Sequence, residues 1–179
     1  GISKGAELAM ILAANQNKLP FKLQAVAIHS PSDVVEAGLN INWLDKRCWV
    51  CPEGIQDCSY QRQYWNRSCG TIGGTYKPEE FDTLPMWRWN GEAIKLGSHI
   101  EIEKYMGPAL ITAGDNDTVW KSDKDRVKRI VAAMQMAGRH PNVQIFKGEE
   151  HSFSLEAEQK RKASVNQFFK QINFLINIT

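Results

Sequence analysis

The sequence predicts an α/β fold, in which helices flank a mostly parallel sheet. One observation behind this prediction is that short apolar runs typical of buried strands alternate with segments whose apolar residues recur at helical spacing. A second is that these regular segments occupy both ends of the 179-residue chain, whereas about residues 30–107 show no lasting periodicity. We therefore expect an α/β domain interrupted by an irregular insertion.

The chain opens on Gly1-Ile2-Ser3-Lys4-Gly5, a G-x-S-x-G pattern, and a helix is expected over about residues 4–15. In this pattern, the nucleophile elbow, a sharp strand-to-helix turn holds the serine at the carboxyl edge of an α/β-hydrolase sheet, and two glycines let strand and helix pack closely. Such an elbow normally follows several strands. Residues 1–179 are therefore expected to form the C-terminal half of an α/β-hydrolase catalytic domain, without its upstream strands.

Three apolar runs predict the strands that follow, and the first two strands are expected to be buried. They cover residues 23–28, which Pro31 ends, residues 107–114, and residues 143–146. Strands that alternate with helices in this way are typical of a parallel sheet.

Two further helices complete the alternation. Ser122 is expected to cap the first, with Asp123 and Asp125 in its first turn and Gly138 as its end. Its core face should carry Val127, Ile130, Val131 and Met134. The last helix should carry a core-facing stripe at i, i+3, i+4 and i+7 spacing, formed by Val165, Phe168, Phe169 and Ile172.

Candidate catalytic residues lie just after the ends of these strands. A serine hydroxyl becomes an effective nucleophile when an imidazole takes its proton and a carboxylate orients that imidazole. Asp117 follows the strand expected to end at Ala113, and His151 follows the strand expected to end near Phe146. Ser3, Asp117 and His151 have the chain order of an α/β-hydrolase triad and lie at the sheet edge where ligands bind. We expect these three residues to be catalytic.

Other residues compete weakly for these roles. Asp115 is the alternative to Asp117 as the acid. His29 follows the first strand but has no acid and histidine pair arranged behind it, and His99 and His140 stand in polar loops typical of solvated side chains. The triad therefore remains the favoured set.

The elbow also predicts part of an oxyanion hole. The backbone N–H of Lys4, the residue after the serine, should donate one hydrogen bond from the helix N-terminus. The second donor is expected from an upstream loop. Neither a cofactor nor a catalytic metal is expected.

The irregular segment of about residues 30–107 interleaves five tryptophans with Gly, Pro, Asn and Cys. So long a connection is uncommon unless it forms a lid or a binding element. We expect a Cys/Trp-rich, cap-like insertion over the active site. The alternative is an irregular surface layer whose tryptophans cover the sheet.

All four cysteines lie in this insertion: Cys48, Cys51, Cys58 and Cys69. Two disulfides are the first interpretation, because the window is loop-like, and they would favour a periplasmic or secreted protein over a cytoplasmic one. A structural zinc site is the second, since Cys48-x-x-Cys51 has ligand spacing, and four free thiols stay open. None of these interpretations makes the cysteines catalytic.

The composition limits the classes of partner that we expect. A net charge of +2, with Lys and Arg scattered along the chain, argues against a nucleic acid partner. No apolar run approaches the ~20 residues that span a bilayer.

Two segments carry a resemblance to a known family. Residues 1–8 and 114–122 resemble the C-terminal catalytic domain shared by acyl-CoA thioesterases and bile acid-CoA:amino acid N-acyltransferases, and the S-K-G-A-E sequence at the elbow is more particular than G-x-S-x-G. The resemblance implies Ser or Cys as nucleophile, the second Asp of the acid turn as the acid, and a His after the next strand. These positions map onto Ser3, Asp117 and His151.

The resemblance implies a serine hydrolase that cleaves acyl thioesters of the acyl-CoA type through an acyl-enzyme. Serine rather than cysteine favours hydrolysis over transfer to an amino acid. Three alternatives stay open: a carboxylesterase or peptidase on the same scaffold, an acyl-CoA:amino acid N-acyltransferase, and an inactive fragment that lacks its N-terminal half. The expected partners are a small acyl thioester or ester substrate and the N-terminal portion of the same protein.

Overall fold

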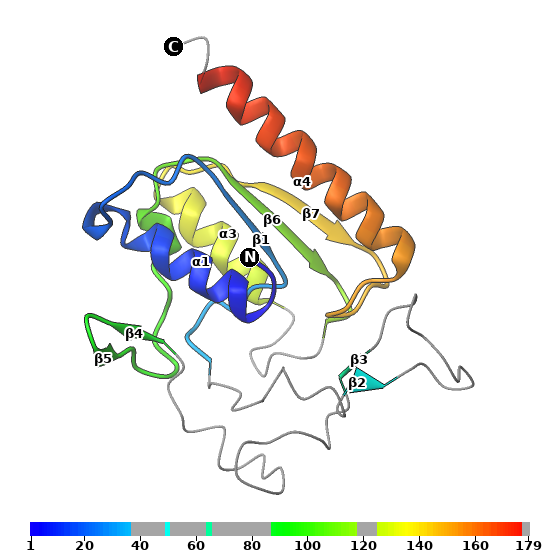
Figure 1. Cartoon of the computed structure of the whole chain (residues 1–179), viewed down its shortest axis with the longest axis horizontal. Helices are drawn as coiled ribbons and strands as arrows, with labels where there is room; N and C mark the ends of the chain where they lie inside the picture. The colour runs from blue at the N-terminus through cyan, green and yellow to red at the C-terminus, as the bar shows by residue number, and fades with distance from the viewer. Residues whose placement is uncertain (37–48, 51–63, 66–86, 118–124, 177–179) are drawn as a thin grey trace, which may run out of the picture. The chain divides into compact units, whose positions relative to one another are not determined.

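The computed structural model of the chain describes residues 1–36, 49–50, 64–65, 87–117 and 125–176 (Figure 1). The chain divides into two compact units, one formed by Gly1–Val35 with Gly97–Thr179 and the other by Glu36–Leu96. The first unit is an α/β structure that contains Ser3, Asp117 and His151. It is therefore the unit that positions the predicted site.

Three parallel strands form the sheet of the first unit, in the order β1-β6-β7. They run over Val26–His29, Ala109–Gly114 and Asn142–Phe146. The prediction of three strands is confirmed, although β1 begins at residue 26 rather than 23. All six residues of β6 are buried, as a central strand covered on both faces requires.

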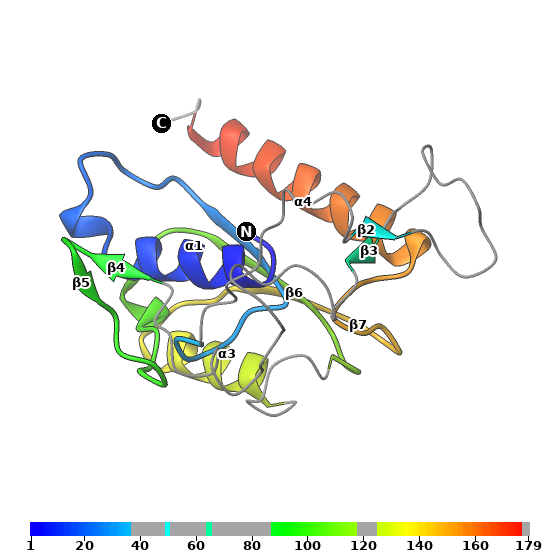
Figure 2. The ribbon, with the colours of Figure 1, turned by 60° about the horizontal axis from the view of Figure 1, so that its bottom comes forward.

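Helices cover both faces of this sheet. α1 (Lys4–Ala14) and α3 (Arg126–Met136) lie on one face, and α4 (Leu155–Ile176) lies on the other (Figures 1 and 2). The short helix η1 (Gln16–Lys18) follows α1. A parallel sheet between two layers of helix confirms the predicted fold class.

The start of α3 differs from the prediction. The helix begins at Arg126 with Asp125 as its N-cap, and Asp125 makes no side-chain capping hydrogen bond. The expectation that Ser122 caps this helix is therefore wrong, and Ser122 itself lies outside the described residues. Tertiary contacts explain the shift, because the buried Arg126 side chain donates from Nε to the carbonyl oxygen of Pro31 at 2.9 Å. The predicted end is confirmed, since Gly138 follows the last turn with φ +73°.

The apolar stripe of α4 is narrower than predicted. Phe168 and Ile172 are buried and pack with Leu110 of β6, and Val165 is partly buried against them. Phe169, however, is 38% exposed, so its predicted place in the core is wrong. Neighbouring helical positions point about 100° apart. Phe169 therefore points away from Phe168 and lines a cavity beside β1.

The limits of the irregular insertion are also narrower than the expected residues 30–107. Residues 30–35 and 97–107 belong to the α/β unit. Ile100, Ile102 and Tyr105 are at most 3% exposed, and the helix η3 (Ile102–Lys104) contacts both α1 and α3. Isolated apolar residues without a period form this part of the core, which is why periodicity did not indicate it.

The second unit, Glu36–Leu96, contains two short antiparallel strand pairs among its described residues. Trp49–Val50 (β2) pairs with Tyr64–Trp65 (β3), and Arg88–Trp89 (β4) pairs with Glu92–Ala93 (β5). The four cysteines, Cys48, Cys51, Cys58 and Cys69, lie outside the described residues. The cap, the disulfides and the zinc alternative stay predictions.

The longest helix of the described chain, α4, alternates apolar with charged residues. Within the residues that the structure describes, no helix has both the length and the apolar character needed to cross a membrane.

Candidate active site

Ser3 stands in a sharp turn between the sheet and α1. Ile2 makes a parallel bridge with His29 at the end of β1, and α1 begins at Lys4. The backbone of Ser3 has φ 54° and ψ −121°, a conformation that costs a residue other than glycine about 1–3 kcal/mol. The turn is held by hydrogen bonds from the Ser3 N–H to the His29 carbonyl, 2.9 Å, and from the Ala6 N–H to the Ser3 carbonyl, 2.8 Å. None of these bonds uses the serine hydroxyl.

The two glycines of the elbow differ in their surroundings. A Cβ atom on Gly1 would lie 2.0 Å from the carbonyl oxygen of Gly5, so only glycine fits at Gly1. A Cβ atom on Gly5 would meet nothing within 4 Å. The prediction that both glycines permit close packing is therefore wrong for Gly5.

The acid turn follows β6 directly and packs against the loop that carries His151. A Cβ atom on Gly114 would lie 2.1 Å from the carbonyl oxygen of Glu149, so the two segments approach closely at this glycine. The Asn116 N–H donates to the same carbonyl at 3.0 Å. Asp117, next in the turn, is only 2% exposed.

His151 lies between the serine and the acid. Its Nε2 is 2.9 Å from Ser3 Oγ, and its Nδ1 is 2.9 Å from Asp117 Oδ2. The three residues come together from positions 148 and 34 residues apart in the sequence. A carboxylate can only accept at Nδ1, so these contacts fit the tautomer that carries its proton on Nδ1 and leaves Nε2 free to accept from the serine hydroxyl.

The loop that presents His151 is anchored at both ends. The Gly148 N–H donates to Asp115 Oδ1 at 2.6 Å. The ring of Phe153 is buried, with its centroid 4.8 Å from that of Phe146 in β7 and 4.4 Å from that of His29 in β1. These contacts hold the imidazole at the carboxyl ends of the strands.

The competing residues lie elsewhere or make other contacts. Asp115 binds the Gly148 N–H rather than the imidazole of His151. His99 is exposed and lies 3.4 Å from Glu103, and His140 is exposed. The structure therefore brings together Ser3, Asp117 and His151 from the predicted set.

Two residues beside the site make contacts that the sequence did not indicate. Arg126 of α3 donates to Asp117 Oδ2 at 2.5 Å, and its side chain is 3% exposed. His29 is 4% exposed, and its Nδ1 lies 3.1 Å from Thr112 Oγ1. Both depend on contacts between residues distant in sequence, and neither belongs to a local motif.

Burial lowers the pKa of His29. Desolvation of the charged ring, together with the positive charge of Arg161, lowers the pKa of His29 to about 4 against the opposing hydrogen bond with Thr112. Arg161 is itself held in α4 by two hydrogen bonds of 2.7 Å to Glu158. His29 is therefore uncharged at neutral pH in the folded protein.

This histidine makes stability depend on pH. Because the unfolded chain binds a proton at His29 below pH 6.5 and the folded chain does so only near pH 4, the free energy of unfolding should fall as the pH falls through this interval, by about 3 kcal/mol in all. The stabilising effect is complete above pH 6.5. We expect His29→Gln to remove most of this loss in urea unfolding at pH 7.5, 5.5 and 4.5. His140→Gln, at an exposed position, should keep the wild-type pH dependence, and an equal dependence in His29→Gln would contradict the prediction.

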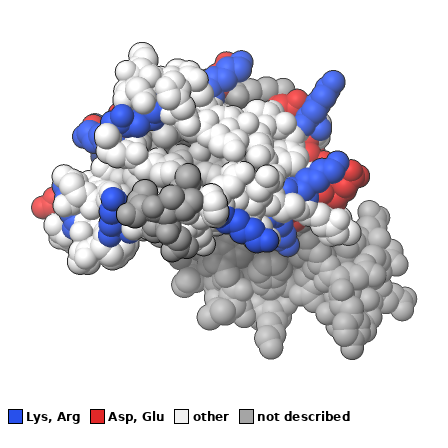
Figure 3. Space-filling model, turned by 90° about the horizontal axis from the view of Figure 1, so that it is seen from above, with Lys and Arg blue, Asp and Glu red and all other residues white. Residues whose placement is uncertain are grey.

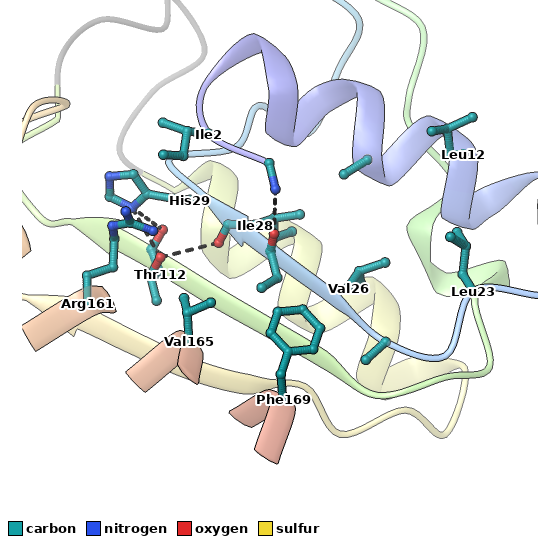
Figure 4. Close-up of a pocket in the computed structure, with 14 residues that line it drawn as sticks. Ile2, Leu12, Leu23, Val26, Ile28, His29, Thr112, Arg161, Val165 and Phe169 are labelled. Atoms are coloured by element: carbon teal, nitrogen blue, oxygen red, sulfur yellow. Dashed lines mark hydrogen bonds between the residues drawn. The ribbon is translucent and has the colours of Figure 1, made fainter. Parts of the chain in front are cut away.

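A cavity of about 420 Å³ lies along β1 between α1 and α4 (Figure 4). Apolar side chains from these three elements line most of it, and His29, Thr112 and Arg161 form a polar end. Ser3, Asp117 and His151 do not line this cavity. The cavity therefore adjoins the candidate site through Ile2 and His29 without containing its reacting groups.

Charged side chains lie in small groups on the surface of the protein. On the face shown in Figure 3, Lys and Arg stand in separate places, several beside Asp or Glu, rather than in one continuous stripe.

Lys4 is the first residue of α1, so its backbone N–H lies in the first turn of the helix beside Ser3. Its Nζ lies 2.8 Å from Oε2 of Glu7, whose side chain is 0% exposed. This ion pair ties the first turn of α1 together at the elbow.

Comparison with known proteins gives one family. The family model described as BAAT / acyl-CoA thioester hydrolase C terminal matches residues 1–156. No curated protein matches the chain.

Solved structures give the fold. The esterase Est2 from the planctomycete Thermogutta terrifontis is 18% identical with a TM-score of 0.52, and the alignment covers 97% of this chain and 54% of the esterase. The same esterase with butyrate bound is 16% identical with a TM-score of 0.51, over 97% of this chain and 55% of that one. A candidate dipeptidyl aminopeptidase IV from Bacteroides ovatus is 14% identical with a TM-score of 0.52, over 96% and 18%. The chain thus spans about half the length of the esterase, and the likeness supports an α/β-hydrolase fold.

Proposed function

The chain belongs to the BAAT / acyl-CoA thioester hydrolase C-terminal family, and we propose on this premise that it is the catalytic portion of a serine hydrolase that cleaves acyl thioesters of the acyl-CoA type. The observation that carries the proposal is the relay in which His151 lies 2.9 Å from both Ser3 Oγ and Asp117 Oδ2. Such a relay activates a serine for acyl transfer.

In the proposed reaction Ser3 Oγ attacks the acyl carbonyl carbon while its proton passes to His151 Nε2. The tetrahedral intermediate collapses with cleavage of the C–S bond, and His151 returns the proton to the leaving sulfur. A water molecule then gives a proton to His151 Nε2 and attacks the acyl carbon. As the second intermediate collapses, the bond between the acyl carbon and Ser3 Oγ breaks, Nε2 returns the proton to Oγ, and the carboxylic acid leaves. Asp117 stays ionised throughout and stabilises the imidazolium that forms twice in the cycle.

The oxyanion of each tetrahedral intermediate needs preorganised donors. We assign one to the backbone N–H of Lys4, which directly follows the nucleophile at the start of α1. An oxyanion hole normally has two donors, so Lys4 supplies half of this stabilisation. Each donor contributes about 2.7–4 kcal/mol to the stability of the transition state in a comparable hydrolase.

The leaving group is tested by paired substrates that share one acyl chain. We expect kcat/KM for butyryl-CoA to exceed that for p-nitrophenyl butyrate by at least about tenfold, or about 1.4 kcal/mol of differential transition-state stabilisation. Thiol release measures the first reaction and nitrophenol release the second, and mass spectrometry should find an acyl group on the Ser3 peptide.

The same assay separates the alternatives. Cleavage of the oxygen ester alone would reject the thioester assignment and favour a carboxylesterase. Formation of N-butyrylglycine when glycine is added would favour an acyltransferase. Absence of any acyl-Ser3 with either substrate would reject the proposed function.

A further inference from the structure

Arg126 contacts the carboxylate of Asp117 in the candidate triad. Its Nη2 donates to Asp117 Oδ2 at 2.5 Å, and its Nε donates to the carbonyl oxygen of Pro31 at 2.9 Å. The side chains of Arg126 and Asp117 are 3% and 0% exposed. The guanidinium therefore joins the turn after β6 to the segment after β1 in the interior of the protein.

The carboxylate oxygen that accepts from Arg126 is also the one that accepts from His151 Nδ1, at 2.9 Å. Rotation about χ2 of an aspartate is only weakly restricted by its intrinsic torsional energy. Two charge-assisted hydrogen bonds from different side chains to one oxygen, however, restrict where that oxygen lies. The direction of the carboxylate thus depends on the guanidinium as well as on the imidazole.

The chemistry of arginine suits this task. Its planar group offers donors at fixed angles, so one side chain can hold the Pro31 carbonyl and the Asp117 carboxylate at the same time. A lysine would bring a single point charge to the same place. Arg126 therefore supplies both charge compensation for a buried carboxylate and a fixed geometry.

We propose that Arg126 is a positioning residue that holds the Asp117 carboxylate in the direction that keeps the His151 proton on Nδ1. The effect on turnover rests on the proposed function, whereas the effect on the imidazole tautomer does not. The other ionisable groups of this region act on His29, which is itself uncharged at neutral pH: Arg161 and Glu158 of α4, and His151.

Arg129 offers a matched control one turn further along α3. It donates to both carboxylate oxygens of Asp33, at 2.6 and 3.0 Å, and the Asp33 side chain is 7% exposed. Arg129→Met thus removes an arginine from a buried carboxylate on the same helix, but that carboxylate is outside the relay. A loss of stability that occurs in both Arg126→Met and Arg129→Met indicates a structural role of the arginine. A change in the His151 tautomer or in kcat that occurs only in Arg126→Met indicates a positioning role.

The test measures two quantities in the wild type, Arg126→Met, Arg126→Lys and Arg129→Met. The first is the tautomer of His151, read from the ¹⁵N shifts of its ring and assigned with His151→Gln. The second is kcat and KM for butyryl-CoA. We expect mixed tautomers and a kcat about 100-fold lower in Arg126→Met, with KM within about twofold, because a misplacement of about 1 Å has a cost of this size. Arg129→Met should retain the wild-type tautomer and kcat.

Arg126→Lys, which keeps the positive charge, provides the test if Arg126→Met does not fold. We expect a kcat about tenfold lower in this variant, with a mixture of tautomers, because lysine keeps the charge and loses the fork. Wild-type tautomer and kcat in Arg126→Lys, or in Arg126→Met, would overturn the proposal. If the wild type has no turnover but holds a single tautomer that the Arg126 variants lose, the proposed function fails and the positioning role stands.

Discussion

Replacing Ser3 with alanine should lower kcat for acyl thioester hydrolysis by on the order of 10⁶-fold, the size of effect seen when the nucleophile of a comparable serine hydrolase is removed. The hydroxyl oxygen of Ser3 is the atom that would form the acyl-enzyme, and it lies 2.9 Å from His151 Nε2, which would take its proton. The measurement is steady-state release of free thiol, with mass spectrometry of the peptide that contains residue 3.

The fold should survive this change. The hydrogen bonds that shape the elbow use the Ser3 backbone, and alanine carries the same Cβ atom as serine at φ 54°. We therefore expect a urea midpoint close to that of the wild type. Ser3→Cys serves as the matched control, because a thiol at this place should still form an acyl-enzyme. The residual activity expected of Ser3→Ala is far below about one-hundredth of the wild-type rate. Turnover above that level would show that Ser3 is not the nucleophile.

Replacing Asp117 with asparagine should lower kcat by about 10⁴-fold, because an amide in this place can donate to Nδ1 and so favours the wrong tautomer of the imidazole. Asp117 Oδ2 lies 2.9 Å from His151 Nδ1 and accepts from Arg126 as well. The variant should also be less stable, since the buried Arg126 loses its counter-charge. Turnover and urea unfolding are measured on the same samples, so the two effects are separated.

Asp115→Asn is the control for this prediction. Asp115 stands in the same turn, but its Oδ1 accepts from the Gly148 N–H at 2.6 Å, and an asparagine side-chain oxygen can accept the same bond. We expect kcat within about threefold of the wild type, as for substitutions that leave the reacting groups in place. A larger loss in Asp115→Asn than in Asp117→Asn would exchange the two assignments.

Several features of this protein were determined by local patterns in its sequence. Apolar runs predicted the three strands. For the central strand β6 the reason is that a strand buried on both faces needs a continuous apolar segment. The G-x-S-x-G pattern predicted a turn at Ser3 followed by a helix, and this is where α1 begins. The positions of Asp117 and His151 after successive strands predicted that they share an edge of the sheet, because parallel strands end on the same side.

Other features depended on contacts that no local pattern records. The first turn of α3 is set by the burial of Arg126 against Pro31 and Asp117 rather than by a capping serine. Which of Asp115 and Asp117 contacts His151 depends on how the loop that carries His151 packs, and that loop is placed by Phe153 and by its close approach to Gly114. The uncharged state of His29 follows from its burial beside Arg161. Sequence periodicity reports the faces of single elements, whereas these features arise where side chains from several elements share one buried volume, and only the tertiary structure decides which of them meet.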